Sequence, residues 1–313
     1  MNRRSFLGIA ASGLAGMVAP RGLHASGAWD GERLVERWSW VMGQPVHITL
    51  FAVTEDAGLE AASRALAELR RIEARLSLFD AASDLVALNE RAGRGPVRIC
   101  PDLEAVLGRS EQLRALTAGA FNPAVEPLMR AWGFRAPRRS RPSTVELAAA
   151  RREVAATRLE LGDGTASLST RAGRLDLGGI GVGYGLDRAG DILRSAGIRR
   201  ALVDVSGDLI ALGSPPGRSG WDVDIATGTP NQLFGTVTIR DAAVATSSNA
   251  TSVVRYPDIV AGHVMDPASG IPAHALAQVS VVAATATEAD AFSTAMLVSG
   301  RRPPGVRELV TLP

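Results

Sequence analysis

The chain has 313 residues with 34 basic and 32 acidic side chains, and every basic one is arginine because the sequence contains no lysine. A P-loop and a lysine Schiff base are therefore excluded, since each needs a lysine amine, and a single cysteine excludes an internal disulfide and a Cys/His zinc cluster. The isoelectric point of about 9.3 is weak evidence for a nucleic-acid partner, because few groups titrate between neutral and alkaline pH in a chain with two tyrosines.

The first 28 residues have the order of an export signal. A short polar start with Arg3 and Arg4 precedes a mildly apolar run over residues 6–18, and small residues follow. This run is too short for a membrane span of about 20 residues. The paired arginines resemble a twin-arginine signal, which implies export of the folded protein to the periplasm; the alternatives are an ordinary secretory signal or an uncleaved anchor. We expect residues 29–313 to form the mature protein, with no stable membrane span.

Removal of this segment would change the charge of the chain. Residues 1–28 contain three arginines and no acidic side chain, so the formal net charge would fall from +2 to −1. The high isoelectric point thus belongs largely to the signal, and we expect no nucleic-acid partner.

Three helices are predicted in the first half of the mature chain. Apolar residues recur at helical spacing over 56–76 and over 102–116. Ser143 and Glu146 have the spacing of a capping box, which predicts a third helix over 144–155.

The segments on either side of this third helix are predicted to be a loop and a hairpin. Residues 135–142 are basic and contain prolines, which favours a solvated loop over a binding patch. Two segments, 158–161 and 166–169, flank a Gly-Asp-Gly-Thr turn, which is a hairpin signal. Because no long linker or fixed repeat is present, these elements predict a single α+β domain. Further strands are expected over 47–51, 201–205, 221–225, 235–239 and 278–283.

A glycine-rich segment, residues 178–185, lies between a predicted strand and a helical pattern over 186–196. Free N–H groups and the dipole at such a helix start suit a phosphate. The segment is not the G-x-G-x-x-G dinucleotide fingerprint, because Tyr184 stands where the third glycine would be required. A tight strand-to-helix turn with close packing is an equally good interpretation.

Two further segments could supply catalytic groups. In a helix, Asp290 and Thr294 share a face with Ser293 beside them, which could form an incomplete magnesium site or could simply cap the helix. His263 precedes an Asp-Pro turn and could be a general base, although a lone histidine is more often structural. The other two histidines of the mature chain are interpreted as structural: His47 and His274.

In this order, and across nearly the whole mature chain, these segments resemble the ApbE-type flavin transferases, the FAD:protein FMN transferases. The resemblance extends to residues 119–128, which by themselves predict only a loop, a short helix and aromatic packing. Each segment is common in unrelated proteins, but eight in the same order are hard to obtain by chance. The matching segments are 41–43, 77–89, 119–123, 175–184, 204–208, 244–247, 263–267 and 289–294.

The resemblance implies a single α+β domain with a core similar to the T-fold, made of mixed or antiparallel sheets and packed helices. It also implies Mg²⁺, FAD as the substrate, and transfer of FMN to a threonine or serine hydroxyl of a partner protein with release of AMP. By position, His263 and Asp290 would be catalytic. The magnesium would lie among the main-chain carbonyl of Gly179 and the side chains of Asp290, Ser293 and Thr294. The flavin- or adenine-contacting positions would be Met42, Phe79, Ala120, Phe121, Asn122, Asp176 and Val264.

Three positions depart from the family pattern. Val182 replaces a common lysine in the glycine-rich, cofactor-binding segment, which removes a cation unless an arginine such as Arg188 reaches in. Asn122 stands where aspartate is common, and Ser206 where glycine is usual. The first departure keeps one alternative open, a non-catalytic exported flavin carrier that matures a respiratory reductase. A Mg²⁺-dependent FAD pyrophosphatase, in which water replaces the partner hydroxyl, is a further alternative.

Overall fold

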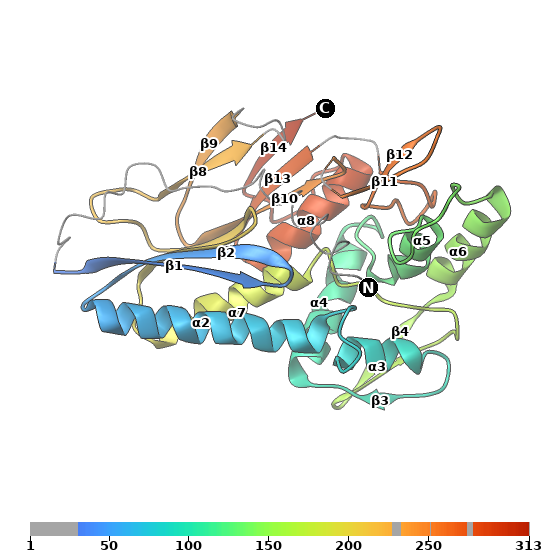
Figure 1. Ribbon diagram of the computed structural model, residues 1–313, viewed down its shortest axis with the longest axis horizontal. Coiled ribbons are helices and arrows are strands. Elements are labelled where there is room, and N and C mark those ends of the chain that lie inside the picture. Colours follow the sequence, from blue (N-terminus) through green and yellow to red (C-terminus); the bar gives the residue numbers. More distant parts are fainter. Residues whose placement is uncertain (1–30, 227–232, 251, 274–277, 313) are drawn as a thin grey trace.

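The computed structural model describes residues 31–226, 233–250, 252–273 and 278–312, so the predicted signal segment and His274 lie outside the described residues. Its largest sheet has seven strands in the order β1-β2-β6-β7-β10-β13-β14, and every neighbouring pair is antiparallel (Figure 1). The strands are β1 Arg33–Val41, β2 Gln44–Ala52, β6 Arg200–Val205, β7 Asp208–Leu212, β10 Ala242–Ser248, β13 Gln278–Ala283 and β14 Glu308–Leu312.

Three helices cover one face of this sheet. α2 packs on β1 and β2, α7 on β6 and β7, and α8 on β10 and β13, and Figure 1 shows α2 and α7 side by side beneath the strands. Leu69, Leu186 and Phe292 are among the side chains buried in the main core between these helices and the sheet. The helices are α2 Glu55–Leu76, α7 Gly181–Ser195 and α8 Ala286–Ser299.

Smaller units surround this core. Hairpin β8-β9 packs on the opposite face of the sheet around the buried Trp221, and a third cluster joins α5 and α6 with hairpin β11-β12. None of the described helices is long and apolar enough to cross a membrane. The bounds are α3 Asp84–Glu90, β3 Val97–Arg98, α4 Pro101–Leu116, α5 Glu126–Ala131, α6 Thr144–Ala156, β4 Leu159–Gly162, β5 Thr165–Leu168, β8 Trp221–Ala226, β9 Leu233–Ile239, β11 Val253–Arg255 and β12 Val260–Gly262.

The segments with clear periodicity or capping signals are confirmed. α2 and α4 cover the predicted 56–76 and 102–116. Ser143 and Glu146 form the predicted capping box of α6, each side chain accepting a backbone N–H of the other. β4 and β5 pair as the predicted hairpin. The α+β class with antiparallel sheets and packed helices is therefore correct.

Helix α7 begins at Gly181, earlier than the predicted start at residue 186. Glycine is a poor helix former, but Gly183 and Gly185 lie where α7 meets its neighbours. A Cβ on Gly183 would lie 2.3 Å from the carbonyl oxygen of Ala286 in α8, and one on Gly185 would lie 2.8 Å from Met42 Cε. The bare backbone permits these close approaches, so tertiary packing outweighs the low helix propensity.

Replacing Gly183 with alanine should lower the free energy of unfolding by about 1–3 kcal/mol, because the added methyl group overpacks the contact with Ala286. The matched control is Gly181→Ala in the same helix turn, where the nearest atom to the new Cβ is 3.9 Å away. There the gain in helix propensity should leave stability unchanged or slightly higher. Denaturant unfolding of both variants checks this; equal midpoints would disprove the close-contact argument.

Candidate active site

The turn that precedes α7 leaves backbone N–H groups without acceptors. Its N-cap residue Ile180 makes no side-chain capping hydrogen bond, and within the described ranges neither Gly179 N nor Val182 N donates a hydrogen bond. Unpaired N–H groups at a helix start favour an anion. The phosphate interpretation of the glycine-rich segment therefore has a structural basis beside the close packing at Gly183.

The four residues predicted at the magnesium come together between this turn and α8. Ser247 Oγ of β10 lies 2.8 Å from Ser293 Oγ and 3.3 Å from Thr294 Oγ1. A Cβ on Gly179 would lie 2.9 Å from Thr294 Oγ1, so the backbone of the turn lies directly against this hydroxyl. Asp290 is buried in the preceding turn of the same helix. The i, i+4 spacing read from the sequence thus does place oxygen atoms on one face of α8.

No cation is among the groups that act on the Asp290 carboxylate in the described part of the chain. Burial raises its pKa well above the usual range, the charges of Asp208 and Asp187 raise it further, and the hydrogen bond from Gly183 N at 3.1 Å opposes this rise. Burial also raises the pKa of Asp208 to about 7, against a hydrogen bond from Thr246 N at 3.0 Å. Two neighbouring carboxylates that resist ionisation fit a bound cation, which would neutralise them.

The chemistry of these donors fits magnesium only in part. Carboxylate, hydroxyl and main-chain oxygens are the ligands that Mg²⁺ prefers. Over the described ranges, no group of three or more His, Cys, Asp or Glu side chains could hold a metal by itself. A phosphate of the substrate would therefore have to complete the coordination. Asp208 was not assigned to the site from the sequence, although it belongs to the 204–208 segment that matches the family.

A second group of predicted residues lies at the other end of the turn. Asp176 Oδ1 accepts a hydrogen bond from Gly178 N at 2.8 Å, and Oδ2 forms an ion pair with Arg135. The Arg135 guanidinium carbon lies 5.7 Å from the ring centroid of Phe79, a side chain that is 83% exposed. Asp176 N donates to Pro123 O at 2.7 Å, which joins the 119–123 loop to the turn.

The prediction of a solvated loop over 135–142 is wrong for its first residue. The Arg135 side chain is only 19% exposed and lies between the carboxylates of Asp176 and Glu126. Arg138 follows the prediction better, since it pairs with the half-exposed Glu146 at 2.7 Å. Local sequence could not distinguish the two arginines, because the carboxylates that hold Arg135 come from other parts of the fold.

His263 belongs to this second group through its electrostatic interactions. Burial lowers its pKa, the charge of Asp176 and a hydrogen bond with the Ser252 backbone raise it, and the charge of Arg135 lowers it. Its Nδ1 atom is buried and has no hydrogen-bond partner among the described residues. A neutral imidazole with an unpaired ring nitrogen can accept a proton. The role of His263 as a base stays a prediction, which a neutral imidazole with an unpaired nitrogen is chemically able to perform.

Of the remaining predicted contact residues, all but Asn122 belong to the main core or pack against it. Asn122 Oδ1 accepts a hydrogen bond from Ala124 N at 2.9 Å and caps a short 3₁₀ helix at residues 123–125. Phe121 and Val264 are buried in the main core, so their side chains pack mainly against protein. Their contacts with substrate stay predictions. The partly buried members that pack against this core are Met42, Ala120 and Val182.

A cavity of about 420 Å³ adjoins Asn122 and Leu175. Its other lining residues include Arg114, Thr157 and Arg158, but none of the residues of the magnesium group or His263. The cavity therefore borders the candidate site and does not contain its chemistry.

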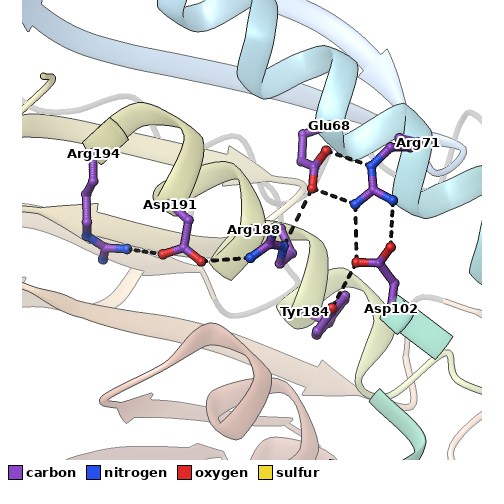
Figure 2. Close-up of polar contacts among 7 residues, drawn as sticks. All are labelled: Glu68, Arg71, Asp102, Tyr184, Arg188, Asp191 and Arg194. Carbon is purple, nitrogen blue, oxygen red and sulfur yellow. Dashed lines mark hydrogen bonds and ion pairs between the residues drawn. The ribbon is translucent and has the colours of Figure 1, made fainter. Parts of the chain in front are cut away.

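Arg188 does not take the place of the missing lysine. Figure 2 shows it turned toward Glu68 and Asp191, at 3.5 and 3.2 Å. Glu68 belongs to a network in which Arg71 of α2 donates two hydrogen bonds to Asp102 of α4, at 2.6 and 3.2 Å. Tyr184 of α7 donates to the same carboxylate at 3.0 Å (Figure 2). The network thus joins α2, α4 and the first turn of α7, which carries the glycine-rich segment.

Removing the hydroxyl in Tyr184→Phe should lower the free energy of unfolding by about 1–2 kcal/mol, because Asp102 loses one charge-assisted hydrogen bond but keeps Arg71. The control on the same network is Arg194→Ala, whose ion pair with Asp191 is half-exposed and should contribute about 0–1 kcal/mol. Urea unfolding of both variants tests the difference. A Tyr184→Phe protein as stable as the wild type would show that this bond does not hold α7.

Comparison with known protein families gives a match along most of the chain. The model of the ApbE family matches residues 42–308. A protein of Treponema pallidum named FAD:protein FMN transferase is 32% identical over 257 residues, which are 74% of this chain and 71% of the relative. A Klebsiella pneumoniae protein of the same name is 28% identical and covers 83% of this chain and 81% of its own.

Solved structures with a similar fold are described as ApbE proteins. The ApbE protein of Thermotoga maritima superposes with a TM-score of 0.78 at 26% identity, covering 85% of this chain and 87% of that one. The apo form of the Pseudomonas stutzeri flavinyl transferase ApbE superposes with a TM-score of 0.74 at 27% identity, covering 85% of each chain.

Proposed function

Since the chain belongs to the ApbE family, we propose that it is an FAD:protein FMN transferase, a transferase that uses FAD as its substrate and another protein as the acceptor of FMN. The observation that carries this proposal is the packing of α8 against the glycine-rich turn. Thr294 Oγ1 approaches Gly179, and Asp290 accepts the N–H of Gly183. Oxygen ligands and unpaired N–H groups thereby meet at one place, as a dinucleotide phosphate requires.

The chemistry follows from what these groups can do. Transfer forms a bond between the acceptor hydroxyl oxygen and the FMN phosphorus, and breaks the bond from that phosphorus to AMP. Asp290, Ser293, Thr294 and the Gly179 carbonyl would hold Mg²⁺, which when bound neutralises charge on the transferring phosphoryl group. The unpaired N–H groups of the turn bind negative charge at the same place. No covalent intermediate with the enzyme is needed.

His263 would accept the proton of the attacking hydroxyl. Burial lowers its pKa, so its imidazole is neutral at pH 7, and the unpaired Nδ1 is the atom that takes the proton. Protonated His263 would then return this proton to water after AMP departs. A positioned base of this kind contributes about 10²–10⁴-fold to a rate.

One assay tests the function. The protein is incubated with FAD, Mg²⁺ and an acceptor domain that offers threonine and serine hydroxyls, and both protein-bound flavin fluorescence and free AMP are measured. The transferase should give labelled acceptor and AMP in equal amounts. AMP and FMN without labelling would indicate a pyrophosphatase, and tight FAD binding without AMP would indicate the flavin carrier suggested by Val182.

We also propose that the enzyme acts in the periplasm on an exported or membrane-bound acceptor. The support is the signal-like sequence of residues 1–28 with its Arg3-Arg4 pair. Residues 1–28 fused to a folded reporter should direct it to the periplasm, and replacing both arginines with lysine should stop this export. Continued export of the lysine variant would contradict the twin-arginine route.

A further inference from the structure

Arg135 is an unexpected cation within the candidate site. Its guanidinium forms an ion pair with Asp176 and lies over the ring of Phe79, 5.7 Å from the centroid. Its charge also acts on His263. All three neighbours were predicted from the sequence to contact substrate or to take part in the reaction, whereas Arg135 was not.

Asp176 connects this guanidinium to the glycine-rich turn that precedes α7. One carboxylate oxygen accepts from Gly178 N at 2.8 Å, and the other accepts from Arg135. A single carboxylate therefore occupies two neighbouring donors, a backbone amide and a guanidinium. A phosphate group could bind the same two donors, since phosphate oxygens accept hydrogen bonds from backbone amides and from guanidinium groups.

Most of the hydrogen-bonding capacity of Arg135 is unused. A guanidinium has five N–H donors, and within the described ranges Arg135 makes one hydrogen bond, to Asp176. Its Nε is buried without a hydrogen-bond partner, 3.7 Å from Glu126 Oε1. Glu126 accepts from Arg130 at 3.0 Å, and its other carboxylate oxygen is buried without a partner, so Arg130 and Arg135 share the charge of this carboxylate.

The charge of the site also indicates that a cation is needed to bind the substrate. Asp176, Asp290 and Asp208 are all acidic, and the substrate brings a negatively charged diphosphate. Position 182, at the start of α7, is a valine, and Arg188 is paired with Glu68 and Asp191. Across the described residues, Arg135 is the one arginine that forms an ion pair with a predicted site residue.

We propose that Arg135 is a substrate-binding residue that contacts a phosphate of FAD. The inference rests on the proposed function, because it takes FAD as the substrate. A planar guanidinium can bind two phosphate oxygens at once, and the Phe79 ring lies beneath this one, where it attracts the cation. In the free enzyme, Asp176 holds the guanidinium where the phosphate binds.

The test compares the binding of three probes without Mg²⁺: FAD, riboflavin, which lacks phosphate, and ADP, which lacks the flavin. Calorimetry gives Kd for wild type, Arg135→Gln and Arg135→Lys. The glutamine variant should weaken FAD and ADP about 10–100-fold and leave riboflavin unchanged, and lysine should recover part of the loss. The matched control is Arg139→Gln, an exposed arginine of the same loop, which should bind all three probes as the wild type does.

The outcomes separate the two proposals. Equal losses for riboflavin, ADP and FAD would show that Arg135 supports the fold of the site and does not contact phosphate. Unchanged affinity for FAD and ADP would overturn the inference while leaving the transferase proposal intact. A wild-type protein that binds no FAD either with or without Mg²⁺ would overturn both.

Discussion

Replacing Asp290 with asparagine should lower kcat for AMP release by about 10³-fold, because asparagine removes the carboxylate charge that would hold the cation. The amide keeps the size of the side chain and its oxygen can still accept from Gly183 N. The same change should leave the metal-free protein as stable as the wild type or more stable. Burial and the charge of Asp208 raise the pKa of Asp290, so the ionised form destabilises the folded state at neutral pH.

A variant that loses activity but keeps or gains stability distinguishes a metal ligand from a structural residue at this position. The rate of AMP release and the melting temperature should be measured with and without Mg²⁺. Adding Mg²⁺ in the presence of FAD should raise the melting temperature of the wild type further, and should not raise that of the variant. The control is Asp191→Asn, an exposed carboxylate on α7, which should change neither quantity. An Asp290→Asn enzyme with wild-type turnover would rule out the metal assignment.

Replacing His263 with alanine should lower kcat by about 10²–10⁴-fold, because the acceptor hydroxyl loses its base. The wild-type enzyme should also lose activity in acid. A base must be neutral, and burial lowers the pKa of His263 below its ordinary 6.5, so the rate should be constant near pH 7 and fall with a midpoint below pH 6.5.

The matched control for this pH profile is His47. Burial lowers its pKa as well, but it stacks on Trp38 at 3.7 Å and forms a hydrogen bond with Glu36 at 3.1 Å, on β1 and β2. His47→Gln should therefore keep the acid limb. A His263→Gln enzyme that retains both wild-type kcat and the acid limb would show that another group is the base.

The sequence predicted elements well where the signal was local. The capping box at Ser143 and the apolar spacing of α2 depend on neighbours in the chain, and both are confirmed. β1 and β10 were missed for a physical reason. β1 is an edge strand whose charged residues and tryptophans hide the alternation, and β10 is a run of small residues that become a strand only between β7 and β13.

The candidate site likewise contains some features that local sequence predicts and others that depend on the fold. The oxygen-bearing face of α8 follows from helical spacing at Asp290 and Thr294, so the sequence could place these residues together. Their meeting with Gly179 depends on the contact between α7 and α8, which no local pattern predicts. The positions of Asp208 and Arg135 are set by contacts between distant segments. Such residues are found only once the chain is folded.

The cation beside the glycine-rich turn is an arginine, and this determines how substrate binding depends on alkaline pH. A lysine there would lose its charge near pH 10, and substrate binding would weaken with it. A guanidinium keeps its charge through the alkaline range, and the chain contains no lysine. We therefore expect the affinity for the diphosphate to be flat on the alkaline side of neutrality.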